Sequence, residues 1–130
     1  MGRLKTEEAQ IGIAPKDICE RTFAFSLRVI RLVAALPNDT VGQMMSRQLA
    51  RSGCGVGASV EEARGATTKK EYSRKMSIAL GEARETHYWL RLASEGGVLP
   101  RKKLESLIAE ADEIVRILVS IVKRTRNGSV

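Results

Sequence analysis

Aromatic residues, cysteines and long apolar runs are all scarce in this chain of 130 residues. Aromatic side chains make up 4% of it, too few to build the base-stacking platform of a single-strand-binding protein. Two cysteines without a CxxC pair can support neither a disulfide framework nor a four-ligand zinc site. No apolar stretch reaches the roughly 18 residues of a membrane span, and the first residues lack the apolar segment of a secretory signal. We therefore expect a cytoplasmic protein with reduced thiols and no membrane partner.

Positive charge, in contrast, is abundant. Twenty-two Lys and Arg residues against fifteen Asp and Glu residues give a formal net charge of +7 at pH 7. An excess of this size suits a polyanionic partner. Because few aromatic side chains are present to stack on bases, we expect any contact with RNA or DNA to be made mainly to phosphates.

Apolar residues recur at helical spacing in four blocks and nowhere alternate with polar residues for long, which predicts an all-α fold. The first helix begins near Pro15, and the second follows an N-cap at Asn38 or Asp39. The third opens with the capping box Thr68–Glu71, and the fourth begins near Pro100. The stripes of the first two helices predict these core positions: Ile18, Thr22, Phe25, Val29, Leu32 and Leu36, then Val41, Met45, Leu49, Ser52, Val56, Val60 and Ala63.

The connections between these helices are short, so consecutive helices must run antiparallel. The prediction is one domain, an antiparallel up-down-up-down four-helix bundle over residues 15–126. A flexible polar tail precedes the bundle at 1–14, and a C-terminal tail follows it at 127–130.

The residues that could perform chemistry lack the companions that the chemistry requires. A di-iron bundle needs carboxylates and Glu-x-x-His motifs, whereas the one histidine, His87, follows Glu85 at a spacing of two. Cys54 and His87 could form a nucleophile and base, but nothing in the sequence orients them, and core roles are favoured for both. We therefore predict no catalytic residue, no metal and no cofactor, and a protein that is not an enzyme.

Three glycines, Gly53, Gly55 and Gly57, lie within the second helical block. A phosphate-binding glycine loop would follow a strand, and this segment has a helical pattern instead. Gly53 and Gly57 are one helical turn apart, so they predict a close approach of another helix, within the protomer or between subunits.

The antiparallel order gathers helix starts and ends at two poles. The start of the first helix, the end of the second, the start of the third, the end of the fourth and the N-terminal tail share one pole. Twelve basic residues lie there: Arg3, Lys5, Lys16, Arg21, Arg64, Lys69, Lys70, Arg74, Lys75, Lys123, Arg124 and Arg126. Seven acidic residues accompany them, which leaves a net +5 at this basic pole.

Two of these cations, Lys69 and Lys70, stand in the first turn of a helix, where the helix dipole disfavours positive charge. An anion site would explain their position, and a merely solvated surface is the alternative. The predicted nucleic-acid-binding residues are Arg64, Lys69, Lys70, Arg74, Lys75, Lys123, Arg124 and Arg126.

The segments Arg47–Glu62, Thr68–Tyr72, Lys75–Leu80 and Glu82–Leu90 together resemble a known family. The family is that of the bacterial four-helix bundle proteins, also called large-subunit rRNA intervening-sequence proteins, and the resemblance extends over about residues 17–122. It implies an up-down bundle that assembles into a homopentamer with a central channel. Some members are encoded inside rRNA intervening sequences, and a similar fold serves as the basic accessory protein of diversity-generating reverse transcriptases. Both associations imply a nucleic-acid partner by analogy.

The predicted function is that of a non-enzymatic, basic helical bundle that forms a homo-oligomer, a pentamer by the resemblance, and binds the backbone of RNA or DNA. Surplus apolar residues on the first helix, namely Phe23, Leu27, Ile30 and Val33, favour self-association because a lone bundle would expose some of them. The alternative is a structural or scaffolding oligomer whose partner is another protein.

Overall fold

The computed structural model describes residues 15–127, the side chains of residues 15 and 16 excepted, and four long helices make up this part of the chain. The helices are α2 (Pro15–Ala34), α3 (Thr40–Arg64), α4 (Lys69–Glu95) and α5 (Arg101–Arg126). No strand occurs among the residues described. The predicted all-α class is confirmed, whereas the tail predicted at 1–14 and residues 128–130 lie outside the described range.

Side-chain caps begin two of the helices where the sequence predicts them. Of the two candidate caps for α3, the structure selects Asp39, whose carboxylate accepts a hydrogen bond of 2.8 Å from the Gly42 amide. At α4, the Thr68 hydroxyl accepts a bond of 3.1 Å from the Glu71 amide. The Glu71 carboxylate instead pairs with Arg74 at 3.2 Å. Of the two hydrogen bonds of a capping box, the structure therefore shows the one that the threonine hydroxyl accepts.

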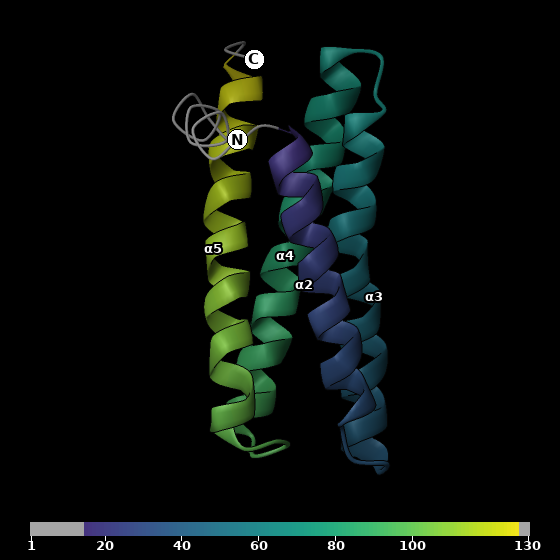
Figure 1. The fold of residues 1–130 in the computed structure, drawn as a ribbon, viewed down its shortest axis with the longest axis vertical. Coiled ribbons are helices and arrows are strands. Elements are labelled where there is room, and N and C mark those ends of the chain that lie inside the picture. Colours follow the sequence, from purple (N-terminus) through teal and green to yellow (C-terminus); the bar gives the residue numbers. More distant parts are fainter. Residues whose placement is uncertain (1–14, 128–130) are drawn as a thin grey trace.

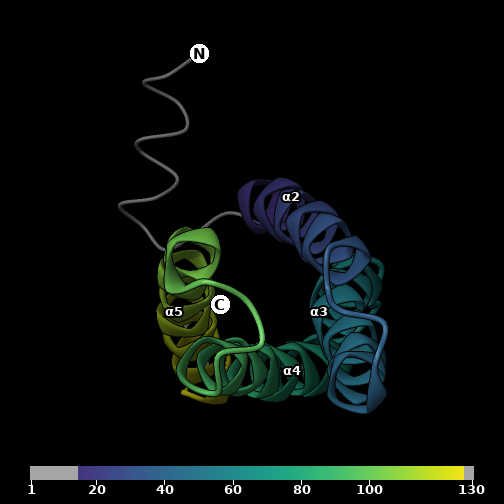
Figure 2. The same ribbon diagram turned by 90° about the horizontal axis from the view of Figure 1, so that it is seen from below.

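Consecutive helices run antiparallel and pack side by side in the order α2, α3, α4, α5, as an up-down-up-down bundle (Figures 1 and 2). Viewed along the bundle, α2 and α4 lie diagonally across from each other, with α3 and α5 on either side (Figure 2). The packing is uneven, since α2 contacts α3 extensively and α5 much less.

The core is the shared interior of the four helices. The core positions predicted for the first two helices are buried with two exceptions. Leu36, which lies just beyond the end of α2, is partly buried, and Val41 is 48% exposed, so its prediction as a core residue is wrong. Val41 lies in the first turn of α3, at the end of the bundle, where no neighbouring helix covers it. The polar core positions are satisfied locally, because Thr22 donates to the Ile18 carbonyl at 2.8 Å and Ser52 to the Gln48 carbonyl at 2.9 Å.

Glycines of α3 admit helix α2 at close range. A Cβ atom added to Gly53 would lie 2.6 Å from a methyl carbon of Val29, and one added to Gly57 would lie 3.3 Å from the Thr22 carbonyl oxygen. Ser26 of α2 donates a hydrogen bond of 2.9 Å to the Gly53 carbonyl, which ties the two backbones together. The interpretation of Gly53 and Gly57 as a close helix contact is confirmed, and the contact lies within the protomer.

Replacement of either glycine should destabilise the protein. We expect Gly53→Leu and Gly57→Leu to lower the free energy of unfolding by about 1 to 3 kcal/mol through overpacking, although leucine is the better helix former. Urea unfolding followed by circular dichroism measures this change.

The chain offers a matched control at Gly81, an exposed glycine inside α4 with nothing within 4 Å of an added Cβ. Gly81→Ala should stabilise the protein by up to about 1 kcal/mol, since alanine has the higher helix propensity. If the leucine variants are also more stable than the parent, the close contact does not constrain the fold.

Candidate nucleic-acid interface

The basic pole predicted from the antiparallel order exists in the structure. The start of α2, the end of α3, the start of α4 and the end of α5 share the upper end of the bundle (Figure 1). Two cross-helix contacts hold this end together: the Thr125 hydroxyl of α5 lies 3.1 Å from that of Ser73 on α4, and Lys75 Nζ of α4 lies 2.8 Å from the Glu62 carboxylate of α3. Arg3 and Lys5 lie outside the described residues.

Three of the predicted nucleic-acid-binding residues have carboxylate neighbours. Arg64 is 3.9 Å from Glu61, Arg74 is 3.2 Å from Glu71, and Lys75 forms the contact with Glu62 already described. The hydrogen bond from Lys75 lowers the pKa of the Glu62 carboxyl below its usual range. Such exposed pairs are weak, but a cation with a carboxylate beside it attracts a phosphate less than a lone one.

The other five predicted residues have no ion pair within the described part of the chain. They lie in two groups: Lys69 and Lys70 in the first turn of α4, and Lys123, Arg124 and Arg126 in the last turns of α5. Four of them are exposed, and Arg124 is half-buried and donates to the Ser120 hydroxyl at 2.9 Å. The α5 group complements its helix dipole, whereas the α4 group opposes it. Unpaired positive charge therefore gathers where α4 begins and α5 ends.

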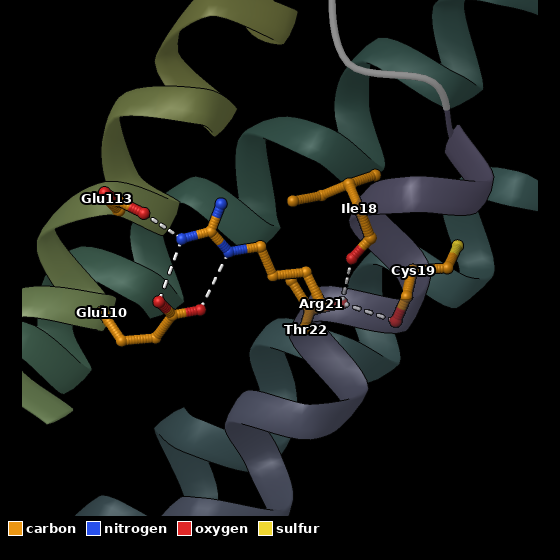
Figure 3. Close-up of polar contacts among 6 residues, drawn as sticks. All are labelled: Ile18, Cys19, Arg21, Thr22, Glu110 and Glu113. Atoms are coloured by element: carbon orange, nitrogen blue, oxygen red, sulfur yellow. Dashed lines mark hydrogen bonds and ion pairs between the residues drawn. The ribbon is translucent and has the colours of Figure 1, made fainter. Parts of the chain in front are cut away.

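Arg21 belongs to the basic pole by position but is already engaged inside the bundle. Its guanidinium reaches from α2 to α5 and binds both oxygens of Glu110 at 2.9 Å, with Glu113 as a further partner (Figure 3). These hydrogen bonds, that to Glu110 foremost, raise the pKa of Arg21 above its ordinary value. Both carboxylates come from the middle of α5, outside the set of residues assigned to the pole, so Arg21 adds little to its free positive charge.

This role of Arg21 was not predicted from the sequence. The available signal was positional: Arg21 directly precedes the buried Thr22, and Glu110 directly precedes the buried Ala111. In an antiparallel first and last helix, such boundary positions can face each other. Arg28, two turns further along α2, makes a similar bridge by donating to the Ser106 hydroxyl of α5 at 2.8 Å.

The potentially reactive side chains of the described residues do not form a catalytic arrangement. Cys19 is buried, and this burial raises the pKa of its thiol and so disfavours the reactive thiolate. Cys54 on α3 and His87 on α4 are both half-buried, and no hydrogen bond joins them in residues 15–127. No group of three or more potential metal ligands occurs in this range, and none of its helices is long and apolar enough to cross a membrane.

These observations define the class of the protein as an antiparallel four-helix bundle with a group of five unpaired cations at one end. The family model described as 23S rRNA-intervening sequence protein matches residues 16–120, so the chain belongs to this family. It is also similar to a protein of unknown function from the S23 ribosomal protein family of Bacteroides thetaiotaomicron, known from a crystal structure. The two are 35% identical over 82% of this chain and 98% of that one, with a TM-score of 0.76. No curated protein matches the chain.

The Arg21 bridge should contribute measurably to stability. We expect Arg21→Gln to lower the free energy of unfolding by about 1 kcal/mol, because a bidentate, half-buried pair is lost across the weakest side of the bundle. The loss should be larger at about 0.05 M salt than at about 0.5 M, since salt screens charge pairs. Urea unfolding at both salt concentrations measures it.

Arg116→Gln is the matched control, because Arg116 pairs with Asp112 within α5 and is well exposed. Its effect should stay within about 0.5 kcal/mol. Equal effects of the two substitutions would show that the bridge between α2 and α5 is no more important than a surface pair.

Proposed function

We propose that this protein is a non-enzymatic, self-associating bundle that binds the phosphate backbone of RNA or DNA through its basic pole. The observation that carries the proposal is the group of five cations without carboxylate partners at one end of the bundle: Lys69, Lys70, Lys123, Arg124 and Arg126. Two of them oppose a helix dipole, a cost of about 0.3 to 1 kcal/mol each that an adjacent anion would reverse.

The family supports the same kind of partner. Its description names the intervening sequence of 23S rRNA. An RNA backbone is therefore the first probe to use, in the cytoplasm where we expect the protein to work.

Binding should depend on the charge and shape of the nucleic acid rather than on its base sequence. Tyr72 is the aromatic residue closest to the unpaired cations in the sequence, and it is half-buried, with its hydroxyl pKa raised by that burial. A ring held in this way is poorly placed to stack on bases. Lysine and arginine side chains neutralise phosphates and release counterions, a contribution that does not depend on sequence.

Removal of four unpaired cations should weaken binding to every sequence alike. We expect the variant Lys69→Gln, Lys70→Gln, Lys123→Gln and Arg126→Gln to bind structured RNA, single strands and duplexes with reduced affinity. Each lost phosphate contact should make the dependence of log affinity on log salt shallower by about 0.7 to 0.9. Gel-shift titrations at two salt concentrations measure both changes. Arg74 and Lys75 stay in place, so that Glu71 and Glu62 keep their partners.

A matched control removes the same charge elsewhere. Arg47, Arg84, Lys102 and Lys103 are exposed and have no ion pair among the residues described, so their replacement by glutamine lowers the net charge equally. This control should retain most of the affinity. If both variants lose the same affinity, the net charge rather than the basic pole accounts for binding.

Self-association is the second part of the proposal. Its support is apolar surface, because large hydrophobic side chains remain exposed on α2 and α4 of the single chain. Light scattering at micromolar concentration should give a multiple of the chain mass of 14.3 kDa, fivefold if the family resemblance extends to assembly. A mass of one chain contradicts this part of the proposal alone.

The same exposed side chains favour the alternative function, a scaffolding oligomer with a protein partner. The two functions differ in one result. If the parent protein binds no nucleic acid at low salt but does self-associate, the backbone-binding function is wrong and the scaffold takes its place.

A further inference from the structure

The helices of the basic pole form two halves of different charge, since α4 neighbours α5 and α2 neighbours α3 (Figure 2). We call the start of α4 with the end of α5 the α4/α5 half. Its charged residues are Lys69, Lys70, Arg74, Lys75, Lys123, Arg124 and Arg126, with Glu71 as the one acid, which gives a net +6. We call the start of α2 with the end of α3 the α2/α3 half. Its charged residues are Lys16, Arg21 and Arg64, with Asp17, Glu20, Glu61 and Glu62 as acids, which gives a net −1. The positive charge of the pole therefore belongs to the α4/α5 half.

Ion pairs increase this difference. In the α2/α3 half, both cations whose side chains the structure describes have carboxylate partners, since Arg64 lies near Glu61 and Arg21 binds Glu110 and Glu113. In the α4/α5 half, five of the seven cations have no such partner within residues 15–127. Free positive charge is thus confined to the ends of two neighbouring helices.

Acidic side chains border this charge. Glu62 at the end of α3 pairs with Lys75 of α4 at 2.8 Å, so a carboxylate of the α2/α3 half lies directly beside the α4/α5 half. Asp17 in the first turn of α2 is half-buried and has no ion pair among the described residues. Neighbouring helix axes are about 8–10 Å apart, close to the Debye length of about 10 Å at 0.1 M salt. These carboxylates therefore repel phosphates that lie over α2 and α3 and act less on phosphates that lie over α5.

A single strand of nucleic acid can use the α4/α5 half fully. The hydrogen bond between Ser73 and Thr125 keeps the start of α4 and the end of α5 beside each other. An unpaired strand is flexible, so its successive phosphates can adjust to cations that stand on two different helix ends. Its bases need no contact with the protein.

A duplex cannot use this half in the same way, because it carries two backbones at a fixed separation. The major groove of B-DNA is about 12 Å wide, similar to the diameter of about 10–12 Å of a helix with its side chains. When one backbone lies on the α4/α5 half, the other lies over the acids of the α2/α3 half or beyond the edge of the protein. Only one of the two backbones then meets cations, and in the first orientation the other is repelled.

We propose that the basic pole selects single-stranded over double-stranded nucleic acid. The strand lies across the start of α4 and the end of α5, and the acids of the α2/α3 half keep a second backbone away. The inference rests on the backbone binding proposed above and names the form of nucleic acid that binds best. Selection by exclusion of the duplex differs from base stacking, for which this chain has few aromatic residues.

Two probes test this selection: a short RNA strand that cannot pair with itself, and the duplex that it forms with its complement. Fluorescence anisotropy at about 0.05 M salt should give the parent protein a severalfold higher affinity for the strand. The variant Asp17→Asn with Glu61→Gln removes one acid from each helix of the α2/α3 half. It should raise the affinity for the duplex by about two- to fivefold per acid, and that for the strand by less, because only the duplex brings phosphates over this half.

Glu95→Gln with Glu105→Gln is the matched control. Both acids are exposed, lie at the opposite end of the bundle and have no ion pair in the described chain, so the net charge changes equally. This control should leave the ratio of the two affinities unchanged, and circular dichroism verifies that both variants fold.

The selection is wrong if the parent binds the duplex as tightly as the strand. It is also wrong if Asp17→Asn with Glu61→Gln raises both affinities in the same proportion, or if the control changes their ratio equally. A parent protein that binds neither probe at low salt overturns backbone binding itself, a result distinct from these three.

Discussion

The close contact between α2 and the glycines of α3 is the constraint on which the rest of the bundle depends. Gly53 and Gly57 have no side chain to hold α2 away, so Val29 and the Thr22 backbone settle directly on α3. The side of α3 that faces α4 also carries small residues. Gly55 lies next to the carboxylate of Glu82 on α4, and this carboxylate accepts a hydrogen bond of 2.7 Å from the Ser59 hydroxyl. Helix α3 is therefore the helix against which both of its neighbours are placed.

The contact of α2 with its other neighbour is different. Helix α2 contacts α5 much less than it contacts α3, and long polar side chains of α2 reach across to α5. Arg21 reaches Glu110 and Glu113, and Arg28 reaches Ser106. The contact between α2 and α5 therefore owes more to charge and hydrogen bonds than the other contacts between neighbouring helices do, although the pairs Lys75–Glu62 and Arg51–Glu85 also join α3 to α4. Salt should weaken the contact between α2 and α5 most.

The ion pairs of Arg21 also affect which part of the basic pole carries free positive charge. A guanidinium held by carboxylates of α5 is lost as a phosphate ligand, whereas the cations at the start of α4 and the end of α5 have no such partner in the described chain. The bond between Ser73 and Thr125 holds these two helix ends together. The pairing of some cations of the pole and not others leaves its free positive charge where α4 begins and α5 ends. The apolar residues divide similarly, into a shared core and the exposed surfaces of α2 and α4.

Local patterns in the sequence determined the four helices, the caps at Asp39 and Thr68, the antiparallel order and most of the core, because each depends on residues within a few positions of one another. The small residues of α3 likewise predicted a close helix contact. Tertiary structure alone decided that α2 makes this contact, that Val41 lies beyond the reach of its neighbours, and that Arg21 pairs with residues about ninety positions away. It also decided which of the eight predicted cations have no carboxylate partner among the described residues. A helical pattern gives the direction of a side chain from its own axis, but what that side chain meets depends on how the other helices are placed around it.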